Sequence, residues 1–85
     1  MLKHTRHFVE RWQSRVGTPV PEPSEVERMI SAGIELQKYR VAFTPRGRRM
    51  VFLQVVWVPT QGLILKIDAL GNRTVTVITE QVAVG

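Results

Sequence analysis

The sequence predicts an α+β fold in which two N-terminal helices pack on a four-stranded antiparallel sheet, in the order α-α-β-β-β-β. In the first third of the chain, apolar residues recur at spacings of three and four, whereas from residue 36 onward they alternate or form short runs. Short turn signals separate these runs, which is typical of antiparallel neighbours. At 85 residues, the chain is expected to form a single domain over residues 1–85 with a modest core.

The first helix is expected over residues 4–16. Phe8, Trp12 and Val16 fall on one stripe of a helical wheel, and Gly17 is a natural C-terminal stop. A neighbouring stripe carries imidazole and guanidinium groups, namely His4, His7, Arg11 and Arg15. The pattern therefore indicates a helix with a face for the core beside a basic face.

The second helix is expected over residues 24–33. The prolines of the connector over residues 18–23 favour an extended chain that leads into it. Ser24 and Glu27 have the spacing of a capping box, with a serine at the cap and a glutamate three residues later. This helix is short, so we expect packing to stabilise it more than propensity does.

The four strands are expected at residues 36–43, 48–58, 63–68 and 73–79. The second run is apolar on both faces, which is typical of a strand that is covered on both sides. A turn over residues 44–47, with a proline early and a glycine late, separates the first two strands.

Side-chain parity suggests a register for the last two strands. A three-residue loop over residues 70–72, or a five-residue loop of the same parity, places Leu65 opposite Val77 and Ile67 opposite Val75, which gives one apolar face. The other face then carries polar residues, namely Lys66, Asp68, Thr74 and Thr76. Two interpretations are open: an ordinary solvent-exposed sheet face, or a binding surface with a lysine for phosphate and threonine hydroxyls for hydrogen bonds.

The charge balance favours a polyanionic partner, most simply nucleic acid. Lys and Arg outnumber Asp and Glu by 12 to 7, and most of this excess is arginine, which binds phosphate with two parallel hydrogen bonds. The candidate nucleic-acid contacts are Arg15, Arg46, Arg48, Arg49, Lys66 and Arg73. The arginine-rich turn at residues 46–49 is either a phosphate clamp or a solvated hairpin tip.

Several function classes are not expected. The chain has no cysteine, no membrane-length apolar run and no secretory signal pattern, so we expect a cytoplasmic protein without disulfides or membrane contact. His4 and His7 are only three residues apart, but Glu10 is the only carboxylate near them. Because a zinc site needs at least three protein ligands, we expect no metal, and no other cofactor is indicated.

Metal-independent cleavage of RNA is the chemistry that fits the basic helix. Histidine is the natural acid–base group, and arginine stabilises the charge that develops on phosphorus. The candidate catalytic residues are His4, His7, Arg11 and, as a hydroxyl group on the last strand, Thr76. The alternative is a histidine pair at a helix start that only packs or meets solvent.

Three short patterns resemble the small toxin-type domains of the barnase–EndoU–colicin–RelE-like ribonuclease superfamily. These are Lys3-His4 through Arg11, the helix start at Pro23-Ser-Glu-Val26, and the closing hairpin from Asp68 to Thr79. The resemblance implies an RNA-cleaving or RNA-binding surface on the open sheet face and the first helix. It matches His4 and Arg11 to the leading motif, and Thr76 or Thr79 to the hydroxyl of the last strand.

These observations together predict an endoribonuclease of toxin or phage-associated type that acts on RNA, either free or on the ribosome. The resemblance also implies a cognate antitoxin or inhibitor protein as a partner. The alternative is a non-catalytic basic module on the same fold that binds nucleic acid or an acidic protein. A third interpretation is an assembly protein that uses the strand around residues 48–57 as an interface.

Overall fold

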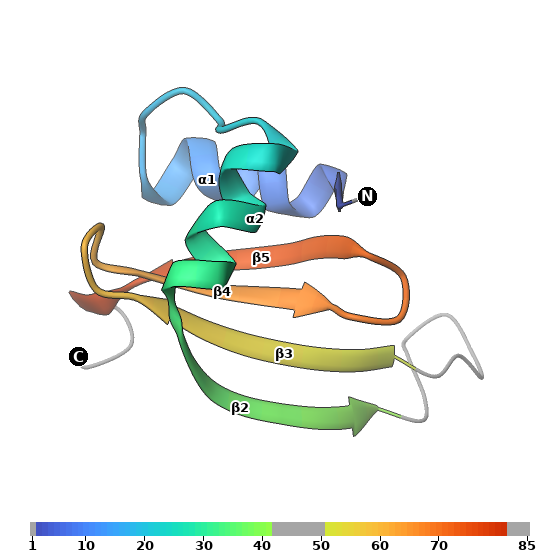
Figure 1. Ribbon diagram of the computed structural model, residues 1–85. Coiled ribbons are helices and arrows are strands. Elements are labelled where there is room, and N and C mark those ends of the chain that lie inside the picture. The colour runs from blue at the N-terminus through green and yellow to red at the C-terminus, as the bar shows by residue number, and fades with distance from the viewer. Residues whose placement is uncertain (1, 42–50, 82–85) are drawn as a thin grey trace.

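The computed structural model describes residues 2–41 and 51–81. Within these ranges two helices lie against a five-stranded sheet, which confirms the α+β class (Figure 1). In chain order the elements are β1 (Lys3–His4), α1 (Arg6–Arg15), α2 (Pro23–Ala32), β2 (Ile34–Val41), β3 (Val51–Val58), β4 (Leu63–Asp68) and β5 (Arg73–Thr79).

The sheet is mixed rather than four-stranded and antiparallel. Its strand order is β1-β5-β4-β3-β2, and the last four strands of the chain pair with their sequence neighbours in antiparallel fashion, as predicted. The additional strand β1 pairs parallel to β5, with Lys3 opposite Arg73 and His4 opposite Thr74. This strand was missed because it is two residues long and its partner is about 70 residues away in the sequence. A local sequence pattern does not indicate a pairing over such a distance.

Helix α1 begins two residues later than predicted, because Thr5 is its N-cap. Thr5 has an extended backbone, and its hydroxyl accepts a hydrogen bond from the Phe8 amide at 3.1 Å. His4 therefore lies in β1 and is not part of the helical stripe with His7 and Arg11. The predicted continuous basic stripe is wrong at its first member.

Helix α2 starts by a different mechanism from the predicted capping box. Its N-cap is Glu22, which makes no side-chain cap bond, and Pro23 occupies the first turn, where its fixed φ suits a helix and its missing N–H costs nothing. Ser24 thus lies inside the helix. The carboxylate of Glu27 instead accepts a hydrogen bond from the Leu2 amide at 2.9 Å, which tethers the start of the chain to α2.

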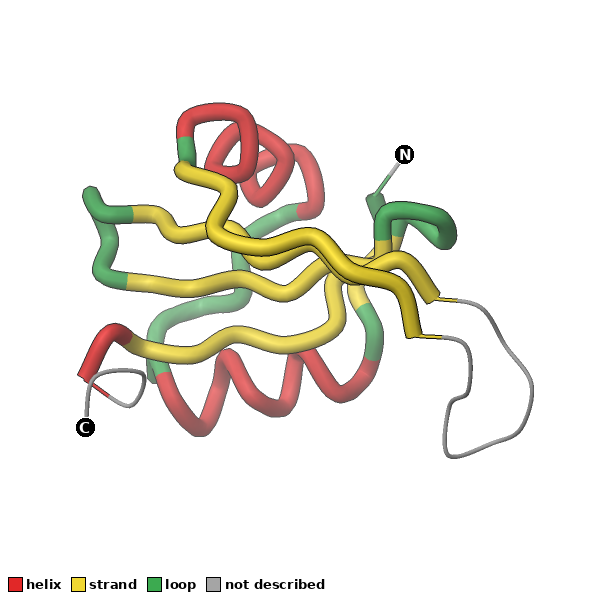
Figure 2. Tube along the Cα trace, turned by 90° about the horizontal axis from the view of Figure 1, so that it is seen from below, coloured by secondary structure: helices red, strands yellow, loops and turns green. Residues whose placement is uncertain are grey.

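The core lies between the two helices and one face of the sheet. Phe8 and Trp12 of α1 and Val26 of α2 are buried against it, and the register places Val56, Leu65 and Val77 side by side on this face. Helix α1 runs beside β5, and α2 leads past β3 into β2, as the ribbon of Figure 1 shows and the tube of Figure 2 shows from below. The helices thus cover one face.

The second face of β3 is also apolar, as predicted, but no described helix covers it. Leu53, Val55 and Trp57 point to this face, together with Ile64 of β4. The Trp57 indole donates a hydrogen bond to the Glu80 carboxylate at 2.6 Å. Strand β3 is therefore apolar on both faces, but the helices of the described residues 2–41 and 51–81 cover only one of them.

The last hairpin confirms half of the predicted register. Leu65 is opposite Val77 and Lys66 is opposite Thr76, but the register then shifts, so that Ile67 faces Thr74 and Asp68 faces Arg73. The extra residue in β5 is Val75, and the loop has four residues (69–72) rather than three. A β-bulge of this kind reverses side-chain parity. Thr74 consequently leaves the predicted polar face and is 1% exposed in the core.

The bounds of β4 and β5 agree with prediction, whereas β2 begins at Ile34, two residues early. Within the described residues, β3 begins at Val51, whereas the predicted strand began at residue 48. Residues 42–50 lie outside the described ranges, and with them the predicted turn at 44–47 and the candidate contacts Arg46, Arg48 and Arg49.

Candidate nucleic-acid interface

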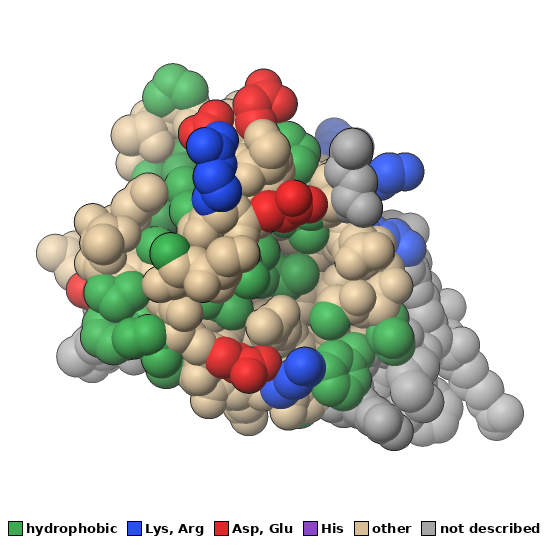
Figure 3. Space-filling model, viewed as in Figure 1, with side chains coloured by type: hydrophobic (Ala, Val, Ile, Leu, Met, Phe, Trp, Pro, Cys, Tyr) green, Lys and Arg blue, Asp and Glu red, His purple; other side chains and the backbone are tan. Residues whose placement is uncertain are grey.

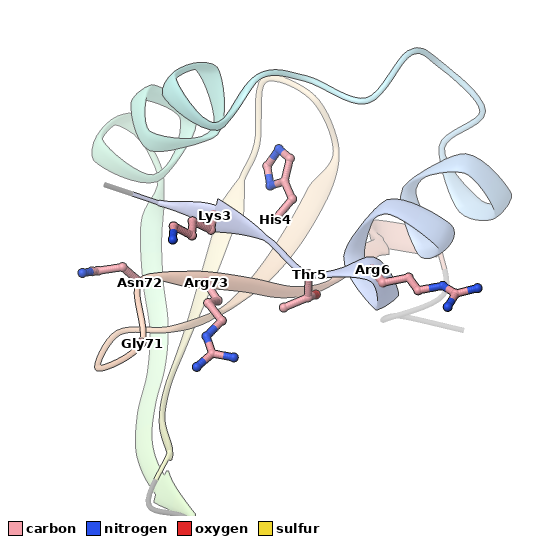
Figure 4. A pocket seen from close by; sticks show the side chains of 7 residues that line it. All are labelled: Lys3, His4, Thr5, Arg6, Gly71, Asn72 and Arg73. Carbon is pink, nitrogen blue, oxygen red and sulfur yellow. The ribbon is translucent and has the colours of Figure 1, made fainter.

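A shallow groove of about 690 Å³ lies where β1, the start of α1 and the loop before β5 meet (Figure 4). Its lining consists of Lys3, His4, Thr5, Arg6, Gly71, Asn72 and Arg73, and we call it the basic groove. Three of these side chains are cations, and none of the described lining residues is acidic. The positive end of the α1 dipole also lies at this groove, because the helix starts at Arg6.

The loop before β5 is held by the Asp68 carboxylate. This side chain is 5% exposed and accepts hydrogen bonds from the amides of Leu70 and Gly71, each at 3.1 Å. A Cβ at Gly71 would lie 2.6 Å from the Asp68 Oδ2, so glycine is required for this close approach. The Asn72 carbonyl then accepts a hydrogen bond from the Lys3 amide at 2.8 Å, which fixes the loop against β1.

His4, the first candidate catalytic residue, links three segments of the fold. Its Nε2 lies 2.7 Å from the Pro21 carbonyl, which only accepts, so Nε2 carries the proton of this hydrogen bond. Its Nδ1 lies 3.0 Å from the Thr74 hydroxyl, and its ring stacks on Phe8 with 4.7 Å between centroids. Figure 4 shows the ring on the opposite side of β1 from the Arg73 side chain. Both ring nitrogens are thus engaged in internal contacts.

His7 and Arg11 lie together on the exposed side of α1. The Arg11 Nε donates a hydrogen bond to the His7 Nε2 at 3.4 Å, and both residues are solvent-exposed. Their spacing of four residues places them on neighbouring turns, as predicted. They are one candidate pair that the structure brings together.

Thr76 lies opposite Lys66 in the sheet, on the face away from the helices. This follows from parity, because the adjacent Val77 points into the helix-covered core. His4 contacts Thr74 on the helix-covered side. The structure therefore places Thr76 and His4 on opposite faces of the sheet, and the four candidate catalytic residues do not converge.

Arg15 has a contact that the sequence did not indicate. Its Nη1 donates a hydrogen bond at 2.9 Å to the Val77 carbonyl in β5. Since β1 pairs only with Arg73 and Thr74 of β5, this guanidinium satisfies a backbone group on a stretch that β1 does not reach. Arg15 thus joins the end of α1 to the sheet.

Of the predicted contacts, Arg73 lines the basic groove, whereas Lys66 lies on the same sheet face as Arg73 but is not among the groove's lining residues. Lys3 and Arg6 also line the groove, but sequence reasoning did not select them. The available signal was their position: both are cations within two residues of Thr5, whose capping residue type marks a helix N-terminus.

The start of α2 and the basic groove differ in charge. The start of α2 carries Glu22, Glu25 and Glu27, whereas the groove carries only cations among its charged groups. Figure 3 shows acidic side chains over α2 with a basic side chain among them, and further basic side chains toward the side where β1 lies.

Neither described helix is long and apolar enough to cross a bilayer, and the described residues include no cluster of three metal-ligating side chains. No protein-family model, curated protein or solved structure matches the chain.

Proposed function

We propose that this protein is a non-catalytic nucleic-acid-binding module that holds a phosphate backbone in the basic groove. The observation that carries the proposal is that Lys3, Arg6 and Arg73, from three separate elements, all line one groove whose described lining has no acidic residue. Arginine donates two parallel hydrogen bonds to phosphate, and the helix N-terminus adds a favourable dipole.

The Arg6 guanidinium remains available to a ligand although it pairs with Glu10. The two groups are 3.1 Å apart, but their side chains are 92% and 60% exposed. Exposed ion pairs of this kind contribute little, so a phosphate group competes readily for the guanidinium. The overall charge of +5 adds long-range attraction to a polyanion.

An endoribonuclease of toxin type is the second candidate, and the His7–Arg11 pair supports it. An exposed imidazole 3.4 Å from a guanidinium supplies an acid–base group beside a phosphate ligand. Binding without cleavage ranks first because His4 uses both ring nitrogens internally and Thr76 lies on the far face of the sheet. Under the second candidate, RNA and an inhibitor protein are the proposed partners.

The salt dependence of binding tests the first proposal. Labelled single-stranded RNA and DNA are titrated with the full chain, and binding is followed by fluorescence anisotropy at two salt concentrations. Three phosphate contacts predict a logarithmic slope of about −2, so a fourfold rise in salt weakens binding roughly twentyfold. Absence of binding at low salt, or binding that does not respond to salt, contradicts the proposal.

A further inference from the structure

Strand β2 forms an open edge of the sheet. It lies at the end of the strand order opposite β1, and no described segment pairs with its outer side. Two of the three exposed large hydrophobic residues of the described chain, Ile34 and Leu36, lie in it, at 48% and 53% exposure. An eight-residue edge strand with exposed apolar side chains is a template for another strand.

The pattern of β2 is best read by its rungs, meaning its positions opposite β3. Leu36 is the extra residue of a bulge between Glu35 and Gln37 and has no rung of its own. The five successive rungs are Ile34, Glu35, Gln37, Lys38 and Tyr39, opposite Trp57, Val56, Val55, Gln54 and Leu53. Glu35 and Lys38 thus lie one rung on either side of Gln37, and Ile34 and Tyr39 lie two rungs away.

The residues on these rungs are complementary to those of a second copy of β2 that runs in the opposite direction. When a second β2 runs antiparallel about the Gln37 rung, Glu35 faces Lys38 of the second copy and Ile34 faces Tyr39 of the second copy. Because the axis is two-fold, each pair occurs twice. Opposite charges and apolar–aromatic pairs directly across an antiparallel ladder are both stabilising.

The faces of the sheet agree with this pairing. Glu35 and Lys38 share the rungs of Val56 and Gln54, so they lie on the helix-covered side, and the Lys38 ammonium lies 5.3 Å from the centre of the Phe52 ring. Ile34, Gln37 and Tyr39 lie on the other side. A two-fold axis perpendicular to the sheet keeps each face with itself, so the paired residues meet on the same side.

We propose that two copies of this chain pair through β2 in antiparallel fashion, with the two-fold axis at the Gln37 rung. Within one chain the Glu35 and Lys38 charges are 4.0 Å apart and about half exposed, so they are held loosely enough to pair across the interface. The basic groove lies at the opposite edge of the sheet and stays open in the dimer. The dimer therefore does not depend on the proposed function.

Sedimentation velocity of the purified chain tests the dimer. We expect a concentration-dependent dimer in wild type. Glu35→Lys and Lys38→Glu each place like charges opposite one another twice, and each is expected to raise the dissociation constant by about tenfold or more. Arg28→Glu is the matched control, because it makes the same charge change as Lys38→Glu on the exposed side of α2 and should leave the dimer unchanged.

Mixing the two variants gives the sharpest readout. In a heterodimer of Glu35→Lys with Lys38→Glu, every facing pair again has opposite charges, so the mixture should associate more tightly than either variant alone. Circular dichroism verifies that each variant is folded. A wild type that stays monomeric at about 500 µM, where even weak specific interfaces form, overturns the proposal and leaves the edge to a strand of another protein. A mixture no tighter than its components also overturns it.

Discussion

The His4 Nδ1 lies 3.0 Å from the Thr74 hydroxyl, a contact that joins the first strand of the sheet to the last. The same ring bonds the Pro21 carbonyl, so it also holds the connector between the helices. Thr74 reaches this position only because the bulge at Val75 turns it into the core. His4, which the sequence indicated as a candidate catalytic residue, thus links β1, β5 and the connector between the helices.

Replacing Thr74 by valine should lower the free energy of unfolding by about 1–2 kcal/mol, because a buried hydrogen bond is lost with little change of shape. His4→Ala should cost more, since it also removes the Phe8 contact. Urea denaturation measures both, and a double-mutant cycle should show coupling between them. Thr76→Val, the same substitution on the other face, is the control. An equal loss of stability there would contradict a special role for Thr74.

Removing the carboxylate of Glu27 should loosen β1. Glu27→Ala removes the hydrogen bond to the Leu2 amide, so the Lys3 amide, which bonds the Asn72 carbonyl, should exchange with solvent at least several-fold faster. Hydrogen exchange followed by NMR measures this rate. Glu25→Ala, on the same helix, should leave it unchanged. Unaltered exchange at Lys3 in Glu27→Ala would show that the tether is not needed.

Arg15→Ala should reduce stability while nucleic-acid affinity changes by less than about twofold, because the guanidinium bonds the Val77 carbonyl instead of lining the groove. The expected loss is about 1 kcal/mol, at the low end for a charged hydrogen bond because Arg15 is exposed. Denaturation and anisotropy titrations measure the two effects separately. A large loss of affinity at unchanged stability would show that Arg15 contacts the nucleic acid, which would contradict this prediction.

Cleavage of RNA separates the two candidate functions. The purified chain, incubated with RNA in the presence of EDTA, should leave the RNA intact on a denaturing gel. If cleavage occurs, His7→Ala should abolish it, since His7 is the exposed imidazole beside Arg11. Arg28→Ala should retain it. Cleavage lost only in His7→Ala would establish the ribonuclease and displace the non-catalytic proposal.

The elements with strong local patterns were predictable. Strands β4 and β5 have the expected bounds because alternation and a turn signal lie within one short stretch of sequence. Strand β1 and the bulge at Val75 could not be predicted from local patterns, because each depends on contacts between distant parts of the chain. Helix α2 was found, but its start was misplaced, because Pro23 at the first turn outweighed the Ser24 capping pattern.

The candidate site was only partly predictable for a related reason. Arg73 was selected from its charge, and the His7–Arg11 pair from its helical spacing. The grouping of Arg73 with Lys3 and Arg6 requires the parallel pairing of β1 with β5, which brings the first residues of the chain beside the start of β5. Charge and spacing alone could therefore indicate a nucleic-acid partner but not the surface that meets it.

The most direct test of the basic groove compares two triple variants that remove the same charge. One is Lys3→Ala/Arg6→Ala/Arg73→Ala in the groove. The other is Arg11→Ala/Arg28→Ala/Lys66→Ala, outside it. Both are titrated with labelled single-stranded RNA at low and moderate salt, after circular dichroism has confirmed their folding.

The groove variant should bind at least about tenfold more weakly and lose most of the salt dependence, because each phosphate contact contributes its own counterion release. The outside variant should keep the wild-type salt slope. Equal losses in the two variants would mean that net charge and not the groove binds the polyanion, and would contradict the proposal.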